Sequence, residues 1–123
     1  MLKLSPLAHT WIFDVDGTIV KHNGYKIDGQ DTLLEGVKEF FAYLPKEDKI
    51  IFLTSRTKEY LPELEKFLSE NNIRYDNIIT DMPMGERILV NDDKPSGLAC
   101  SYALRKKRDL QSILGRNSDR FFF

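Results

Sequence analysis

The sequence has one cysteine, no long apolar run and almost no net charge. Cys100 has no partner for an internal disulfide, which indicates a reducing, cytoplasmic compartment. The apolar runs fall short of the roughly 20 residues that a membrane-spanning helix needs, so no membrane contact is expected. Residues 1–10 do not resemble a signal peptide, since they hold one lysine and no long apolar stretch. Lysine and arginine number 18 against 19 acidic residues, and this balance gives no electrostatic reason to expect nucleic acid as a partner.

What the sequence does have is the composition of one globular domain. Of its 123 residues, 41% are hydrophobic and 30% are charged. A chain of this length buries about two-thirds of its unfolded surface, so it needs neither a metal nor disulfides to form a core. We therefore expect a single domain over 1–123, with a core over about 8–104 and a basic tail over 105–123.

Short apolar runs alternate with longer amphipathic stretches, which is typical of βαβ units. Strands are predicted over 9–15, 49–53, 78–80 and 87–91. The first helix is predicted to begin at Asp31 or Thr32 and to end before Pro45. The second is predicted to begin at Ser55 or Thr57 and to end near Asn71. The expected fold class is α/β: a Rossmann-like three-layer sandwich with a mainly parallel sheet and helices on both faces.

Polar side chains follow three of these predicted strands. Asp14 and Asp16 lie at the end of the first strand, Thr54 and Ser55 follow the second, and Asp92 and Asp93 follow the fourth. Because parallel strands end at the same edge of a sheet, these side chains are expected to meet there, where ligands of such sheets usually bind.

Carboxylates, hydroxyls and glycine at one point suit phosphoryl transfer. Carboxylates that repel each other favour a hard cation such as Mg²⁺, with Asp14 and Asp92 as its expected ligands. Asp14 can attack a phosphoryl group, and Asp16 can protonate the leaving oxygen and later activate water. Gly17 lets the backbone approach a phosphate closely, and the Thr54 hydroxyl and nearby N–H groups can hold its oxygens.

The sequence Asp14-Val-Asp-Gly-Thr18 resembles the first motif of the haloacid dehalogenase superfamily, and Thr54 and Asp92-Asp93 resemble its second and fourth motifs. The resemblance spans roughly residues 10–100. It implies an Mg²⁺-dependent phosphatase that forms an aspartyl-phosphate, with Asp14, Asp16 (through its backbone carbonyl), Asp92 and Asp93 at the metal. Residues 20–30 are long enough only for a hairpin flap, so the resemblance is to the capless members.

The cation that should bind the phosphate is not marked by a distinctive motif. The family places a lysine or an arginine ahead of its fourth motif, where Lys58, Lys66 and Arg87 stand in this chain. Lys94, directly after Asp93, is the first choice because the sequence puts it at the predicted site, and Lys58 is the second. Ser55 completes the predicted phosphate-binding set.

The resemblance implies a small phosphorylated metabolite as substrate, such as a sugar or sugar-acid phosphate, with a link to surface polysaccharide synthesis. One alternative is a binding or regulatory protein that keeps the fold without strong catalysis. Another is a phosphatase of a macromolecule, such as a nucleic-acid 3′-phosphate, which an open site permits. The terminal Phe121-Phe122-Phe123 indicates a homo-oligomeric contact as one expectation.

Overall fold

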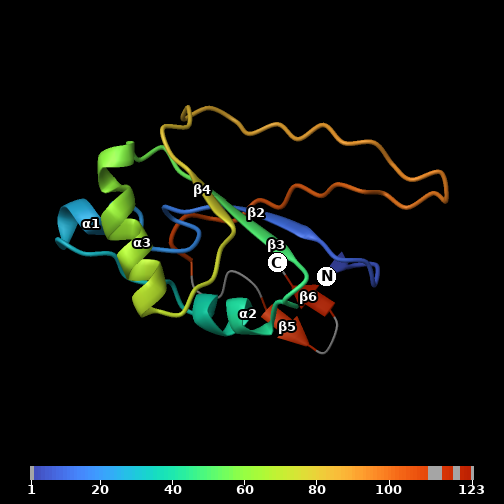
Figure 1. Cartoon of the computed structure of the whole chain (residues 1–123), viewed down its shortest axis with the longest axis horizontal. Helices are drawn as coiled ribbons and strands as arrows, with labels where there is room; N and C mark the ends of the chain where they lie inside the picture. Colours follow the sequence, from blue (N-terminus) through green and yellow to red (C-terminus); the bar gives the residue numbers. More distant parts are fainter. Residues whose placement is uncertain (1, 111–114, 118–119, 123) are drawn as a thin grey trace.

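The structure is a computed structural model that describes residues 2–110, 115–117 and 120–122. Figure 1 shows a small parallel sheet with helices beside it, a long excursion of chain, and a second small sheet where the two termini meet. No helix in the described part of the chain is long and apolar enough to cross a membrane.

The main sheet contains β2 (Thr10–Asp14), β3 (Lys49–Leu53) and β4 (Asn77–Ile79), in that order. All pairings are parallel, and Phe13 lies opposite Phe52, which lies opposite Ile78. The expected parallel α/β sheet is therefore confirmed for three strands. β2 has a strand partner on one side only among the described residues, so its other edge is free.

The helices bury one apolar stripe each against a single face of this sheet. They are α2 (Val37–Tyr43) and α3 (Leu61–Glu70), the latter preceded by the 3₁₀ turn η1 (Lys58–Tyr60). Phe13 of β2 packs against Phe41 of α2 with ring centroids 5.0 Å apart, and Leu64 of α3 joins the same core. Asn71 ends α3 as expected, since its side-chain amide donates to the Phe67 carbonyl.

The prediction of helices on both faces is wrong for the described residues. Strand order β2-β3-β4 proceeds in one direction, so right-handed connections place both intervening helices on the same face. Ile12 and Ile79, which point to the opposite face, remain exposed. A second helical layer would require a strand on the free side of β2.

The first helix begins later than the caps predicted for it. The backbone around Thr32 is extended, because the Lys21 amide donates to the Thr32 carbonyl and Val20 bridges Leu33. Gly36 then adopts a left-handed conformation (φ 87°) directly before α2. Residues 20–30 also differ from the expected hairpin flap, because they contain the short helix α1 (Gly24–Ile27).

The strand predicted over 87–91 does not form. These residues begin a long out-and-back excursion that crosses the upper part of Figure 1, in which Ile88 and Val90 are 85% and 89% exposed. Two hydrogen bonds hold the excursion folded back on itself. The backbone amide of Lys94 donates to the Leu98 carbonyl. The side-chain amide of Asn91 donates to the Cys100 carbonyl. Those bonds replace the pairing with β2 that a fourth strand would have made.

The second sheet joins the two ends of the chain. β1 (Leu2–Lys3) pairs antiparallel with β6 (Arg120–Phe122), which pairs with β5 (Gly115–Asn117). The backbone of Phe121 thus lies opposite Leu2. The part predicted as a basic tail therefore contributes strands to a sheet.

Replacing Leu64 by alanine is expected to lower the free energy of unfolding by about 2–5 kcal/mol, because its side chain is fully buried in the core. Urea denaturation followed by circular dichroism measures this loss. Leu7→Ala is the matched control, since Leu7 is 52% exposed, and it should change stability by less than about 1 kcal/mol. Equal losses in the two variants would contradict the assignment of the core.

Candidate active site

The candidate site lies at the carboxyl ends of β2 and β3. In-register pairing sets Asp14, the last residue of β2, beside Leu53, the last residue of β3. The residues that follow each strand therefore face one another, and the Thr54 hydroxyl donates to Asp16 Oδ2 at 3.4 Å. The structure thus brings the first two predicted groups of site residues together.

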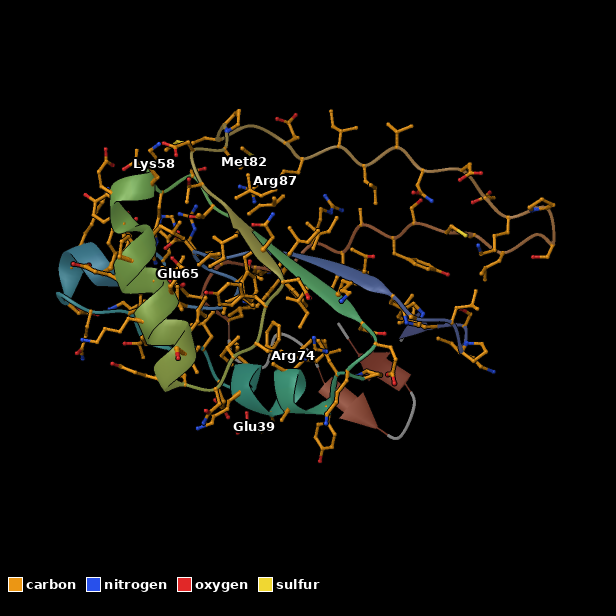
Figure 2. All side chains as sticks on the ribbon, in the orientation of Figure 1. Glu39, Lys58, Glu65, Arg74, Met82 and Arg87 are labelled. Carbon is orange, nitrogen blue, oxygen red and sulfur yellow. The ribbon has the colours of Figure 1, made fainter. Side chains whose placement is uncertain are left out.

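Asp14 is partly exposed and is held by two donors. The Thr18 hydroxyl donates to Oδ2 at 3.1 Å, and Arg87 Nη1 donates to Oδ1 at 2.7 Å. Thr18 belongs to the same turn, whereas Arg87 enters from the excursion, near the upper edge of the sheet in Figure 2. Asp14 therefore has an open side, an orienting hydroxyl and a cation beside it.

Asp16 is held by a buried arginine. Arg56 Nη2 donates to Asp16 Oδ1 at 2.8 Å, and its Nε reaches both oxygens of the same carboxylate. The other side of the guanidinium forms two hydrogen bonds with Asp31, at 2.7 and 3.0 Å. One arginine therefore links two carboxylates that come from different segments of the chain.

Arg56 also carries an aromatic cover. The Tyr25 ring of α1 lies over the guanidinium, 3.9 Å from its carbon to the ring centroid, and the Tyr60 ring meets Tyr25 edge-on. Burial by itself would lower the pKa of Arg56, but the hydrogen bonds and charges of Asp31 and Asp16 outweigh it and raise that pKa. Arg56 is therefore a permanent cation that fixes α1 beside Asp16.

Gly17 occupies a position that needs glycine. Its φ is 86°, and a Cβ added there would lie 3.0 Å from Cγ of Arg108. Its carbonyl accepts hydrogen bonds from Lys106 Nζ at 3.2 Å and from the Asp109 amide at 3.0 Å. The turn after β2 is thus in contact with residues 105–108, which were predicted from the sequence only as part of a basic tail.

Lys106 brings a third cation close to the site, in addition to Arg56 and Arg87. Burial lowers the pKa of its ammonium group, and the charge of Asp109 opposes that decrease. The ammonium group of Lys106 donates a hydrogen bond to the Gly17 carbonyl, so it lies at the turn that follows Asp14.

The remaining predicted site residues do not meet at this point. Ser55 is partly buried next to Thr54, and Lys58 is exposed at the start of η1. Asp93 accepts a hydrogen bond from the Cys100 amide within the excursion. Asp92 and Lys94 line the same groove as Asp14, which runs along β2.

The predicted Mg²⁺ ligands are only partly brought together in the described part of the chain. Among them, no three His, Cys, Asp or Glu side chains lie close enough together to hold a metal ion. Asp14 and Asp16 have the oxygen donors that Mg²⁺ prefers, but each carboxylate is paired with a guanidinium, and Asp92 does not join them. Mg²⁺ binding therefore stays a prediction.

Three basic residues contact the site in ways that the sequence did not predict. Arg56 is not among the site residues predicted from the sequence, Arg87 is one of several candidate cations, and Lys106 belongs to the predicted basic tail. The position of Arg56 two residues after Thr54 was a usable signal, because it follows the end of β3. The contacts of Arg87 and Lys106 depend on the path of residues 82–110, which has no periodic pattern to reveal it.

Comparison with known proteins gives one structural likeness. A chain in the structure of the Pnkp1/Rnl/Hen1 RNA repair complex matches with a TM-score of 0.52 and 26% sequence identity. The match covers 71% of the present chain and 30% of the other, so the present chain spans less than a third of that neighbour. No protein-family model matches, and no curated protein does.

The expectation that nucleic acid is not a partner is contradicted by this likeness, because the matched chain belongs to an assembly that repairs RNA. The expectation rested on a total charge near zero. Total charge says nothing about how cations are distributed over the surface, and the structure gathers several of them near Asp14.

Replacing Arg56 by alanine is expected to lower the free energy of unfolding by about 3–5 kcal/mol, because Asp16 and Asp31 would lose their shared cation. Thermal and urea denaturation measure the change. Lys66→Ala removes a cation from an exposed pair with Glu70 and should cost less than about 1 kcal/mol. An equal loss of unfolding free energy in both variants would show that the buried ion pairs of Arg56 stabilise the fold no more than an exposed pair does.

Proposed function

We propose that this chain is a hydrolase of phosphate monoesters and that its substrate is the phosphorylated end of a nucleic acid. The observation that carries the proposal is the pair Asp14 and Asp16 at the end of β2, each paired with an arginine. The resemblance of Asp14-Val-Asp-Gly-Thr18 to the first motif of the haloacid dehalogenase superfamily supports the reaction class.

The first chemical step is an attack by Asp14. One carboxylate oxygen forms a bond to phosphorus while the bond from phosphorus to the ester oxygen breaks. The leaving oxygen takes a proton from Asp16, which has to enter this step in its protonated form and not as the carboxylate paired with Arg56. The product alcohol leaves, and the phosphoryl group stays on Asp14.

The second step returns the enzyme to its starting state. Asp16 accepts a proton from water as the water oxygen attacks phosphorus, and the bond between phosphorus and Asp14 breaks. Arg56 supports this role because its hydrogen bonds hold the Asp16 carboxylate in a single orientation.

Arg87 is the best-placed cation for the phosphate. It donates to the proposed nucleophile at 2.7 Å, so it can bind phosphoryl oxygens that approach Asp14. Lys94 and Lys58, the two cations preferred from the sequence, form neither a hydrogen bond nor a salt bridge with Asp14 among the described residues. Their roles in phosphate binding stay predictions.

The choice of a nucleic-acid end rests on two observations. The structural neighbour comes from an RNA repair complex, which agrees better with this substrate than with a sugar phosphate. The proposed nucleophile is also partly exposed, and the segment 20–30 adds only the four-residue helix α1 beside the site. A large substrate can therefore approach.

Asp14→Asn is expected to abolish hydrolysis of p-nitrophenyl phosphate, because an amide cannot replace the carboxylate as nucleophile. Release of p-nitrophenol measures turnover. Asp28→Asn is the matched control, since Asp28 forms an exposed pair with Lys21 away from Asp14 and should leave turnover unchanged. Full activity of Asp14→Asn would rule out the covalent mechanism.

The substrate class is tested by comparing phosphate release from four kinds of ester: 3′-phosphorylated oligonucleotides, sugar phosphates, sugar-acid phosphates and phosphopeptides. Each is assayed with and without Mg²⁺. We expect the highest kcat/KM for the oligonucleotides. A preference for sugar-acid phosphates would support a metabolic phosphatase instead, and no turnover of any ester would support a binding protein.

A further inference from the structure

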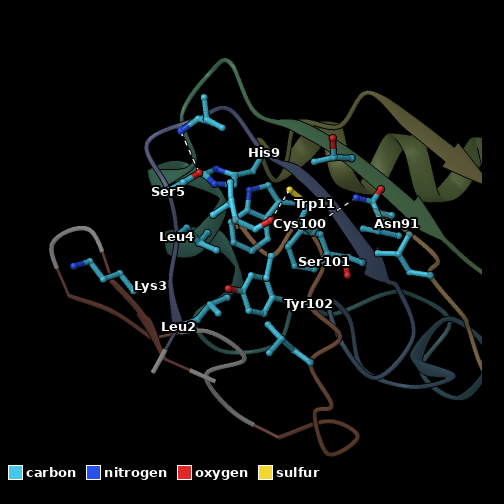
Figure 3. Close-up of a pocket in the computed structure, with 18 of the residues that line it drawn as sticks. Leu2, Lys3, Leu4, Ser5, His9, Trp11, Asn91, Cys100, Ser101 and Tyr102 are labelled. Carbon is cyan, nitrogen blue, oxygen red and sulfur yellow. Dashed lines mark hydrogen bonds between the residues drawn. The ribbon is translucent and has the colours of Figure 1, made fainter. Parts of the chain in front are cut away.

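A groove of about 1180 Å³ runs along the free edge of β2. Figure 3 looks into it: one wall comes from residues 2–13, and the other from the excursion, which contributes Asn91, Cys100 and Tyr102. We call it the β2 groove. Asp14 and Thr18 also line it, so the groove is continuous with the candidate site.

The β2 groove concentrates positive charge. Its cationic lining residues outnumber its carboxylates, Asp14 and Asp92, although the whole chain carries 18 cationic and 19 acidic residues. The cations are Lys3, Lys94, Arg105, Lys106 and Lys107. All but Lys106 are exposed, and none of the five forms a salt bridge with another described residue. Their charges are therefore available to an anionic partner.

Aromatic rings also line the groove. Tyr102 is 51% exposed, and Trp11 and His9 line the opposite wall. The indole N–H of Trp11 donates to Asp48 at 2.9 Å, so its ring is fixed in orientation. Cations that follow a groove, together with aromatic rings, are the features that bind single-stranded nucleic acid without sequence preference.

We propose that the β2 groove binds single-stranded nucleic acid and leads its phosphorylated end to Asp14. This inference rests on the proposed function, since it supplies the path by which that substrate reaches the site. β2 has five residues and is therefore about 17 Å long, which is enough for a few nucleotides beside the strand. The sugar-phosphate backbone meets the lysines and arginine, and bases stack on Tyr102.

The groove also has features that a protein partner could use. Several leucines line it, and the free edge of β2 could accept an extended peptide as an added strand. The excess of cations favours the nucleic acid, because an apolar peptide strand has no need of four exposed positive charges.

The test is fluorescence anisotropy with the full chain and a labelled, 3′-phosphorylated single-stranded oligonucleotide. Arg105→Glu/Lys107→Glu reverses two groove charges, and Lys38→Glu/Lys46→Glu reverses two exposed charges elsewhere. We expect the groove variant to bind at least about tenfold more weakly and to lower the salt slope by about two, whereas the control variant binds normally. Tyr102→Ala is expected to weaken binding on the order of tenfold through lost stacking.

Hydrolysis of p-nitrophenyl phosphate separates this inference from the proposed function. The groove variants should still hydrolyse this small ester, because Arg105, Lys107 and Tyr102 form no hydrogen bond or salt bridge with Asp14 among the described residues. A wild-type chain that hydrolyses the ester but does not bind the oligonucleotide overturns the groove proposal and leaves the phosphatase proposal intact. Groove-dependent binding without any ester hydrolysis supports the groove and rejects the phosphatase.

Two further results would overturn the groove proposal. Equal weakening in the groove and control variants would mean that binding depends on total charge alone. Protection of β2 amides from hydrogen exchange by an acidic peptide, with none from the oligonucleotide, would assign the groove to an added peptide strand. Protection of the Thr10–Asp14 amides from hydrogen exchange by the oligonucleotide supports the groove proposal.

Discussion

The site depends on the parallel, in-register pairing of β2 with β3. This pairing makes both strands end at the same level, so the turns that follow them bring Asp16 and Thr54 together. A shift of one residue would turn Asp14 to the other face of the sheet, because side chains alternate along a strand. The core resists such a shift, since Phe13 and Phe52 are both buried on the same face.

Charge is balanced around this sheet edge by arginines. Arg56 is buried between Asp16 and Asp31 and holds α1 beside the strand ends, whereas Arg87 reaches Asp14 from the excursion. These two arginines differ in what they can do. Arg56 is saturated by protein carboxylates and acts on orientation, while Arg87 has a single carboxylate partner in a partly exposed place and can exchange it for a phosphate.

The sequence predicted the parts that periodic patterns control. The two strands that carry Asp14 and Thr54 and the helix that ends at Asn71 could be read from apolar runs and end signals. The prediction of a strand over 87–91 was wrong. Strand propensity and an apolar pattern do not reveal that this part of the excursion bonds to the later part of the same excursion, near Cys100.

The cations at the site were hard to predict for a related reason. Arg56 stands two residues after β3 and could be placed near the sheet edge from its position alone. Lys106 lies 89 residues after Gly17 in the sequence. The residues around Lys106 do not indicate which distant turn its side chain contacts. Such long-range contacts are set by packing. The total charge of the chain likewise does not reveal that cations outnumber carboxylates along the β2 groove.

The central claim is that Asp14, at the end of β2, takes up the phosphoryl group. Rapid acid quenching during turnover of a phosphate ester, followed by peptide mass spectrometry, tests it directly. The account predicts one added phosphoryl group on the peptide that contains Asp14, removed by hydroxylamine as an acyl phosphate would be. A chain that turns over the ester with no phosphoryl group on Asp14, or with one on another residue, would contradict the account.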